Sequence, residues 1–198
     1  MSTYSVGLNA QEQAWELPSR GTVAMVSLII GESAIFTIFV VAYIFYLGKS
    51  LTGPTPHQVL EVPWFNTICL LSSSFTIWRA EQAIARGAMT RFTAWLTATI
   101  TLGVVFLAGT AQEWLKLIYQ DGLTIRTNLF GTTFYSLVGL HATHVVVGLV
   151  MLSLVLGFAL AGKVGGQHAE RFKVLGLYWH FVDAVWVVVF TVVYILGR

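Results

Sequence analysis

Long apolar stretches separated by short polar segments set the pattern of this chain. The stretches span residues 21–48, 62–86, 92–115, 130–161 and 174–197. An α-helix needs about 20 mostly apolar residues to cross a hydrocarbon core about 30 Å thick, and each stretch is long enough. The second is uncharged only as far as residue 78, and we extend it past Arg79 because a long arginine side chain reaches the membrane surface. The pattern predicts five transmembrane helices.

The same pattern indicates the fold class. Lipid offers no hydrogen bonds to an open sheet edge, and the stretches lack the ten-residue alternation of barrel strands. The four prolines fall before the stretches, between them or at the start of one, where a missing backbone donor is tolerated. We therefore expect an all-α polytopic membrane protein, a bundle of five transmembrane helices that forms a single domain over residues 1–198.

Composition excludes other classes of protein. Hydrophobic residues make up 56% of the chain and charged residues 10%, against about 25% charged in a soluble domain. The formal net charge of +2 is too small for the basic stripe of a nucleic-acid-binding protein. The one cysteine, Cys69, cannot form an intrachain disulfide. The first twenty residues have neither a basic start nor an apolar stretch, so we expect no cleavable signal peptide.

Basic residues predict the orientation. Five spans place the termini on opposite sides, and cytoplasmic loops carry the excess of lysine and arginine. One side holds Lys49, Lys116, Arg126 and Arg198. The other side holds seven, namely Arg20, Arg79, Arg86, Arg91, Lys163, Arg171 and Lys173. We therefore expect a prokaryotic cell-membrane protein with a cytoplasmic N-terminus and a C-terminus on the exported side.

Ionisable residues within the spans are the candidate functional groups, because such groups are costly in lipid. They are Glu32, His141, His144, His180 and Asp183. Glu32 lies 11 residues (32 − 21) into the first span, about 16 Å at the 1.5 Å helical rise. His180 and Asp183 are three residues apart and can pair on one helix face, and all five groups fall in the central third of the bilayer. Two interpretations stay open, a proton relay and a hydrogen-bonded packing network.

Metal ligation is less well supported by the spacing. Carboxylate-bridged bundles use Glu-x-x-His on two helices and further glutamates on the others, whereas here only Glu32 and Asp183 lie at matching depth. A haem would need axial ligands on facing helices, such as His141 and His180, but Asp183 is the nearer partner of His180. We expect no metal and no cofactor bound by this chain.

Four residues are candidates for contacts with lipid or with another protein. Trp179 and Trp186 flank Asp183 on one helix face, and Glu113 and Trp114 lie at the end of the third span. Aromatic residues near span ends are typical of the membrane interface.

Several motifs resemble subunit III of the haem-copper terminal oxidases. The signature helices are similar to residues 139–148 (GLHATHVVVG) and 178–186 (YWHFVDAVW). The family's glutamate-bearing helix resembles residues 31–33 (GES) with Phe36, Phe39 and Tyr43, and a link between helices resembles residues 112–114 (QEW) with Gly122 and residues 130–134 (FGTTF). The resemblance covers residues 20–198, and the chain looks like the short five-helix form, without the first two helices of the seven-helix form.

The resemblance implies a function. Glu32 corresponds to the family glutamate, and His180 and Asp183 to the paired histidine and aspartate. The family implies a non-redox subunit of a proton-pumping cytochrome c oxidase, an enzyme only as part of the complex. Haem and copper would reside in partner subunits I and II, while this chain would support the catalytic subunit, bind phospholipid and help proton supply.

Other functions remain open at this point. The chain could be subunit III of a quinol oxidase, a branch that residues 190–194 (FTVVY) also resemble. It could be an accessory protein of a related nitric oxide reductase, or an assembly factor that leaves the mature complex. Copper ligands in subunit II would distinguish a cytochrome c oxidase from a quinol oxidase, and equal stoichiometry in the purified complex would distinguish a subunit from an assembly factor.

Overall fold

The computed structural model describes residues 19–50 and 52–197, which form helices and connecting loops without a strand. The long helices are α1 (Arg20–Tyr46), α3 (Trp64–Ala85), α4 (Met89–Tyr119), α5 (Leu129–Leu160) and α6 (Ala169–Phe190). Two short elements are α2 (Pro56–Val59) and the 3-10 turn η1 (Gly166–His168), and α6 continues into the π-helical η2 (Thr191–Leu196). The all-helical prediction is confirmed for these residues.

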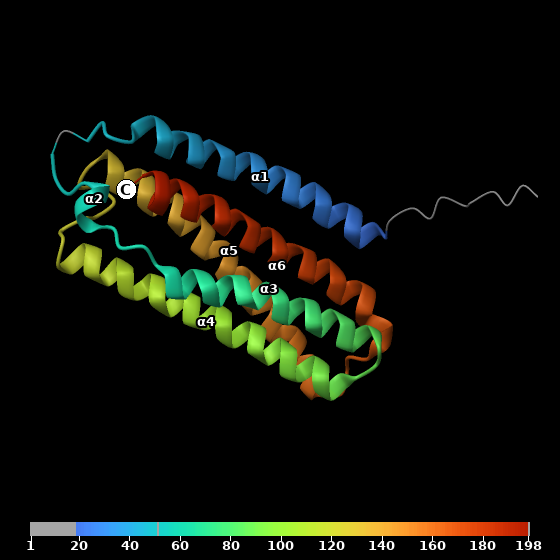
Figure 1. Cartoon of the computed structure of the whole chain (residues 1–198). Coiled ribbons are helices and arrows are strands. Elements are labelled where there is room, and N and C mark those ends of the chain that lie inside the picture. The colour runs from blue at the N-terminus through green and yellow to red at the C-terminus, as the bar shows by residue number, and fades with distance from the viewer. Residues whose placement is uncertain (1–18, 51, 198) are drawn as a thin grey trace, which may run out of the picture.

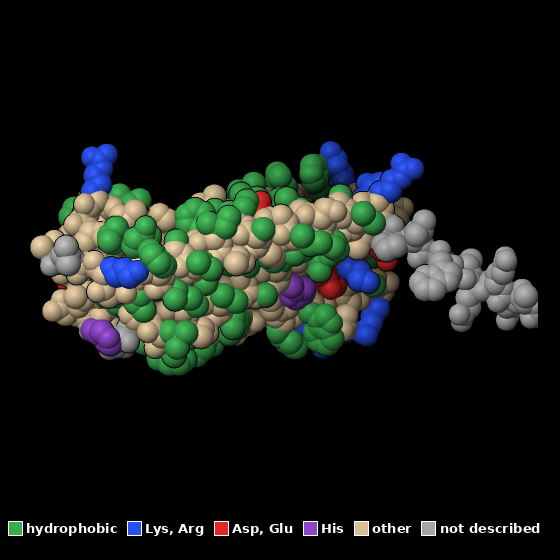
Figure 2. All heavy atoms as spheres, turned by 90° about the horizontal axis from the view of Figure 1, so that it is seen from above, with side chains coloured by type: hydrophobic (Ala, Val, Ile, Leu, Met, Phe, Trp, Pro, Cys, Tyr) green, Lys and Arg blue, Asp and Glu red, His purple; other side chains and the backbone are tan. Residues whose placement is uncertain are grey.

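The long helices lie side by side as a bundle in which successive helices run in opposite directions (Figure 1). One end of the bundle gathers the starts of α1, α4 and α6 with the ends of α3 and α5. We call it the basic end, because Lys and Arg side chains cluster there (Figure 2). They include Arg20, Arg86, Arg91, Lys163, Arg171 and Lys173. The opposite end holds α2 and the loops before α3 and α5.

Four helices are long and apolar enough to cross a membrane. They are α1, α4, α5 and the continuous helix Gly166–Leu196. The remaining long helix, α3, lies within the bundle against α4 and α6, but Arg79, Glu81 and the serines at 72–74 make it less apolar. The five-span prediction is therefore confirmed for four spans. The helices also extend beyond the predicted apolar limits, since α4 ends at Tyr119 and α6 begins at Ala169.

Two capping residues fix where helices begin. The Ser19 hydroxyl accepts a hydrogen bond from the Thr22 amide at the start of α1 (3.2 Å). The Asn128 side chain accepts one from the Gly131 amide at the start of α5 (2.8 Å) and donates to the carbonyl oxygens of Thr52 and Pro54. Such caps satisfy amides that have no partner within the helix. Asn128 therefore also ties the loop before α5 to the segment after α1.

Tryptophan side chains of α6 fill the centre of the bundle. Trp179 and Trp186 are 0% and 1% exposed. Glycines on neighbouring helices make room for Trp179: a Cβ atom at Gly148 would lie 2.9 Å from its ring, and one at Gly103 would lie 3.0 Å from it. Real Cβ atoms essentially never show the first distance, and the second is tighter than nine in ten of their contacts. These two glycines allow α4 and α5 to approach α6.

Two outer faces of the bundle differ in side-chain size. The exposed face of α1 carries large residues, among them Ile30, Ile38 and Phe45. The exposed face of α4 carries mostly small ones at positions repeating every three to four residues, and we call it the α4 face. Its members are Thr90, Ala94, Thr97, Thr101, Val104, Ala108, Ala111 and Leu115.

Candidate functional site: polar side chains within the bundle

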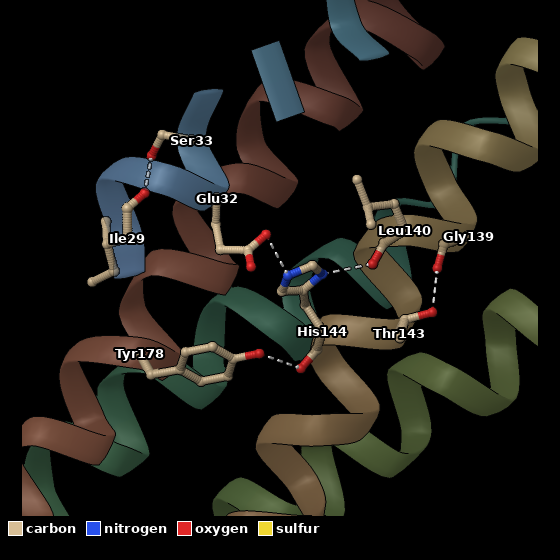
Figure 3. A network of polar contacts seen from close by, with 8 residues as sticks. All are labelled: Ile29, Glu32, Ser33, Gly139, Leu140, Thr143, His144 and Tyr178. Carbon is tan, nitrogen blue, oxygen red and sulfur yellow. Dashed lines mark hydrogen bonds and ion pairs between the residues drawn. The ribbon is translucent and has the colours of Figure 1, made fainter. Parts of the chain in front are cut away.

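Glu32 on α1 and His144 on α5 form an ion pair across the groove between their helices (Figure 3). His144 Nε2 lies 3.2 Å from Glu32 Oε2, and His144 Nδ1 lies 2.8 Å from the Leu140 carbonyl oxygen. Since a carbonyl only accepts, Nδ1 carries a proton. The Nε2 contact then needs one further proton, held either by the imidazole as a cation or by the carboxyl. The pair therefore holds one exchangeable proton between two helices.

The surroundings of this pair are apolar and partly open. The side chains of His144 and Glu32 are 13% and 24% exposed, and both line a crevice of about 300 Å³ with Met25, Leu28 and Met151. The Tyr178 hydroxyl donates to the His144 carbonyl oxygen at 3.2 Å (Figure 3). This bond links α5 to α6 beside the pair, so Tyr178 belongs to the same cluster. The spacing of Tyr178 from the motif histidines in the sequence did not reveal this contact.

His141 lies one helical turn before His144 in a different environment. It is 0% exposed, and neither ring nitrogen has a hydrogen-bond partner among the described residues. Its ring contacts Phe106 on α4 and Trp186 on α6, with centroid distances of 5.8 Å and 5.0 Å, and these two rings also contact each other at 4.8 Å. The geometry is that of an aromatic core residue.

Ser74 on α3 joins His180 and Asp183 on α6. The Ser74 hydroxyl donates to Asp183 Oδ2 and lies 3.1 Å from His180 Nδ1. Asp183 is 3% exposed, and its Oδ1 has no partner in the described part of the chain. The direct pair expected for His180 and Asp183 is wrong: no contact within 4 Å joins their charged atoms, because Ser74 approaches from α3 and takes the position between them.

The five ionisable residues thus form three separate arrangements and not one common polar interior. Sequence reasoning found all five but missed Ser74 and Tyr178, which supply the contacts between helices. The run of three serines at 72–74 within an otherwise apolar span was the one sequence feature that pointed to polar contacts made by α3.

The expectation that Trp179 and Trp186 contact lipid or a partner is wrong. Both side chains are buried within the chain. Trp179 Nε1 donates to Ser73 Oγ at 2.9 Å, and Trp186 Nε1 donates to Thr67 Oγ1 at 3.2 Å. Both indole N–H groups therefore point toward α3, whose hydroxyl groups accept their hydrogen bonds.

Glu113 and Trp114 lie at the opposite end from the basic residues. The Tyr194 hydroxyl is 3.0 Å from both carboxyl oxygens of Glu113. Glu113 also lines a crevice of about 290 Å³ that Lys116 shares. The Trp114 ring packs against Tyr135 at a centroid distance of 5.3 Å. Both side chains thus make contacts within the chain. Their contact with lipid or a partner stays a prediction.

Among the described residues, no group of three or more His, Cys, Asp or Glu side chains is arranged to hold a metal ion. The nearest arrangement, His180 with Asp183, has one histidine and one carboxylate, and Ser74 bonds to both. That the chain carries no metal or cofactor stays a prediction.

Comparison with known proteins gives consistent matches over nearly the whole chain. A family model described as cytochrome c oxidase subunit III matches residues 21–198. The chain is similar to cytochrome c oxidase subunit 3 of Thermostichus vulcanus (33% identical over 96% of this chain and 94% of the relative) and of Synechocystis sp. (37%, 87% and 74%). It is also similar to cytochrome bo(3) ubiquinol oxidase subunit 3 of Pseudomonas aeruginosa (31%, 85% and 81%).

Proposed function

Because the chain belongs to the cytochrome c oxidase subunit III family, we propose that it is the non-redox subunit III of a proton-pumping cytochrome c oxidase. It contacts subunits I and II, which carry the haem and copper, and it supports the catalytic subunit. The observation that carries this proposal is the family match, which extends over every long helix. The arrangement of the polar side chains supports it, since most of them bind other groups of the same bundle.

The α4 face is the surface that we assign to the catalytic subunit. Small residues let helix backbones approach closely in lipid, where packing drives association. The α4 face offers such residues at Ala94, Ala108 and Ala111, whereas α1 exposes large ones such as Ile38. The contrast supports a protein contact at α4 and a lipid contact at α1.

Phospholipid is the ligand that we propose for the outer grooves. A crevice of about 300 Å³ between α1 and α6 is lined mainly by apolar side chains, among them Phe36, Val40, Phe181 and Val185. Such a lining suits an acyl chain, whose burial is favourable at about 0.8 kcal/mol per CH₂ group. A lipid seated there fills the space between the two helices.

We also propose that α3 is the fifth span and that the basic end faces the cytoplasm. The 22 residues of α3 extend about 33 Å at the helical rise, enough to cross the hydrocarbon core. Its Arg79 lies 5.3 Å from the Trp95 ring centre, toward the basic end. The excess of lysine and arginine at that end supports a cytoplasmic N-terminus in a prokaryotic cell membrane.

A quinol oxidase is the second candidate, because the Pseudomonas aeruginosa relative is named a ubiquinol oxidase subunit 3. Its identity of 31% is close to the 33% of the Thermostichus vulcanus relative. Oxidation of reduced cytochrome c or of quinol by the purified complex distinguishes the two. An accessory protein of a nitric oxide reductase is distinguished by the gas that the complex reduces.

The experiment that tests the proposal is purification of the complex through a tag on this chain. We expect equal amounts of this chain and a haem-containing catalytic subunit, with oxygen consumption. Ala108→Phe on the α4 face should reduce the recovered catalytic subunit severalfold, whereas Ile38→Phe on α1 should not. Recovery of the chain without a haem-containing subunit would contradict the proposal and favour an assembly factor, and equal recovery for the two variants would remove the α4 face as the contact.

A further inference from the structure

A second polar region lies near the basic end, apart from the Glu32 and His144 pair. A pocket of about 330 Å³ opens there between α1, α3 and α6. Its lining includes polar and ionisable side chains from all three helices, namely Thr22, Glu81, Glu170, Lys173 and His180. Histidine, acidic and basic side chains lie near one another on this side of the molecule in Figure 2. Such a lining suits water better than an acyl chain.

The pocket extends inward along one face of α6. Glu170, Lys173, His180 and Asp183 are separated by three, seven and three residues, so they lie on one side of the helix. Asp183 is 14 residues (183 − 169) from the start of α6, about 21 Å along its axis. Ionisable side chains thus continue from the basic end to the interior of the bundle.

Hydrogen bonds connect the inner end of the pocket to Asp183. His180 lines the pocket, and its Nδ1 lies 3.1 Å from Ser74 Oγ. The Ser74 hydroxyl donates to Asp183 Oδ2. A serine hydroxyl accepts and donates at the same time, so Nδ1–H of His180, the Ser74 hydroxyl and the Asp183 carboxyl form an unbroken chain. Nε2 of His180 has no hydrogen bond to the described residues and remains available to the pocket.

We propose that this pocket is a water-filled inlet, and that His180 and Ser74 carry protons between it and Asp183. A hydronium ion in the pocket gives a proton to His180 Nε2 and is left as water, the Nδ1 proton passes to Ser74 Oγ, and the Ser74 hydroxyl proton passes to Asp183 Oδ2. The imidazole is left neutral with its proton on Nε2, the hydroxyl is restored and the carboxyl is neutral. The reverse sequence returns the proton, and no electron moves.

The other ionisable groups around this route are placed so that they do not interrupt it. On the helices packed against it they are Glu81, Glu170, Lys173, Glu32, His141 and His144. Glu32 and His144 bind each other, and His141 has no hydrogen bond to the described residues. Glu81 and Lys173 line the pocket itself, outside the chain of hydrogen bonds from His180 to Asp183. The inference depends on the bundle and not on which oxidase contains it.

Water access is tested by cysteine labelling of the purified complex. Leu177 lines the polar pocket, while Phe181, one turn further along α6, lines the apolar crevice between α1 and α6. Each is changed to cysteine in a chain that also carries Cys69→Ala. A cationic methanethiosulfonate should modify Leu177→Cys at least about tenfold faster than Phe181→Cys, because a fixed charge is costly outside water. Equal rates, measured by mass spectrometry of this chain, would overturn the inlet.

Proton transfer is tested by infrared spectroscopy of the same complex during exchange into D₂O. Asp183→Asn identifies the carboxyl band of Asp183 by its loss. A positioned proton carrier typically contributes about 100-fold or more, so Ser74→Ala should slow the deuterium shift of that band at least about tenfold. Ser73→Ala is the matched control, since Ser73 binds Trp179 and lies outside the route.

Three results would contradict the transfer route. The first is exchange in Ser74→Ala as fast as in the unchanged complex. The second is equal slowing in Ser73→Ala and Ser74→Ala, which would mean that any lost serine in α3 has this effect. The third is the absence of an Asp183 carboxyl band between about pH 5 and pH 9, the range that brackets ordinary histidine titration. If Asp183→Asn fails to assemble, the cysteine labelling still decides whether the inlet holds water. Oxygen consumption by the complex tests the proposed function separately.

Discussion

The two histidines of α5 lie one turn apart and meet different surroundings. His144 donates through Nδ1 to the Leu140 carbonyl and contacts Glu32 through Nε2. His141 has no hydrogen bond to the described residues, and its ring packs against Phe106 and Trp186. A separation of three residues rotates the side chain by about 60° around the helix. That rotation moves the imidazole from the α1 side of α5 to the side facing α4 and α6.

The comparison shows that one residue type serves two physical roles in this bundle. A buried polar group without a partner costs about 1–3 kcal/mol, and His141 offsets this cost by close contact with two aromatic rings. His144 keeps its polar function because α1 brings a carboxyl to it at a partly exposed position. We therefore expect His141 to be replaceable by an apolar ring and His144 not to be.

The largest expected effect comes from removing the buried ring. His141→Ala leaves a cavity beside the Phe106 and Trp186 rings, and truncation of a large core side chain costs about 3–5 kcal/mol. The free energy of unfolding should fall by about that amount, measured by denaturant titration of the chain in detergent micelles. His144→Ala is the matched control and should fall less, because its ring is partly exposed. Equal losses would mean that the two environments do not differ in packing.

A smaller effect is expected when the polar partner of Glu32 is removed. His144→Phe keeps a ring beside Phe36 but leaves the Glu32 carboxyl without its hydrogen bond. An unpaired group of this kind costs about 1–3 kcal/mol. The double variant that also carries Glu32→Leu should recover most of the loss in the same titration. No recovery would show that the loss arises from the ring substitution and not from the carboxyl.

Replacing His141 with another ring should change stability still less. His141→Phe keeps a ring packed against Phe106 and Trp186 and removes two buried nitrogens without partners. Volume-conserving core changes usually cost under about 1.5 kcal/mol, and here the lost polar atoms favour the variant. We expect a change within about 1 kcal/mol of zero. A loss as large as that of His141→Ala would reveal a polar partner for His141 in the assembled complex.

The sequence located the helices because the apolar length of a span is directly visible in it. It did not reveal which tryptophans are inside, because aromatic residues occur both at the membrane interface and in the core of a bundle. Trp179 and Trp186 were assigned to the outside on that basis. The burial of Trp179 depends on the room left by Gly103 and Gly148 on other helices, a contact between distant segments.

The polar partners show the same limit. The motif spacing identified His180 and Asp183, and it correctly placed them on one helix face. It could not show that Ser74 on α3 lies between them, because serine is common in membrane helices and its sequence position does not indicate its partner. Likewise, Glu32 and His144 are separated by 112 positions in the sequence, so their contact follows only from the packing of α1 against α5.

The smallest expected effect concerns the exchangeable proton of the Glu32 and His144 pair. In Glu32→Gln the side-chain amide donates to a neutral His144 Nε2, or its oxygen accepts from a protonated one. The hydrogen bond is kept in both cases, so stability should change by no more than about 0.5 kcal/mol, and assembly should be intact. The variant loses a carboxyl, however, and should therefore no longer react with hydrophobic carbodiimides. The control variant Ser33→Ala, one position away, should keep this reaction.

Because the pair in Glu32→Gln lacks a titrating acid, any part it takes in proton handling should appear as faster inactivation during sustained turnover of the reconstituted complex, or as fewer protons pumped per electron. Unchanged turnover lifetime and pumping, with the carbodiimide reaction lost, would assign Glu32 to packing alone and leave both α5 histidines with structural roles.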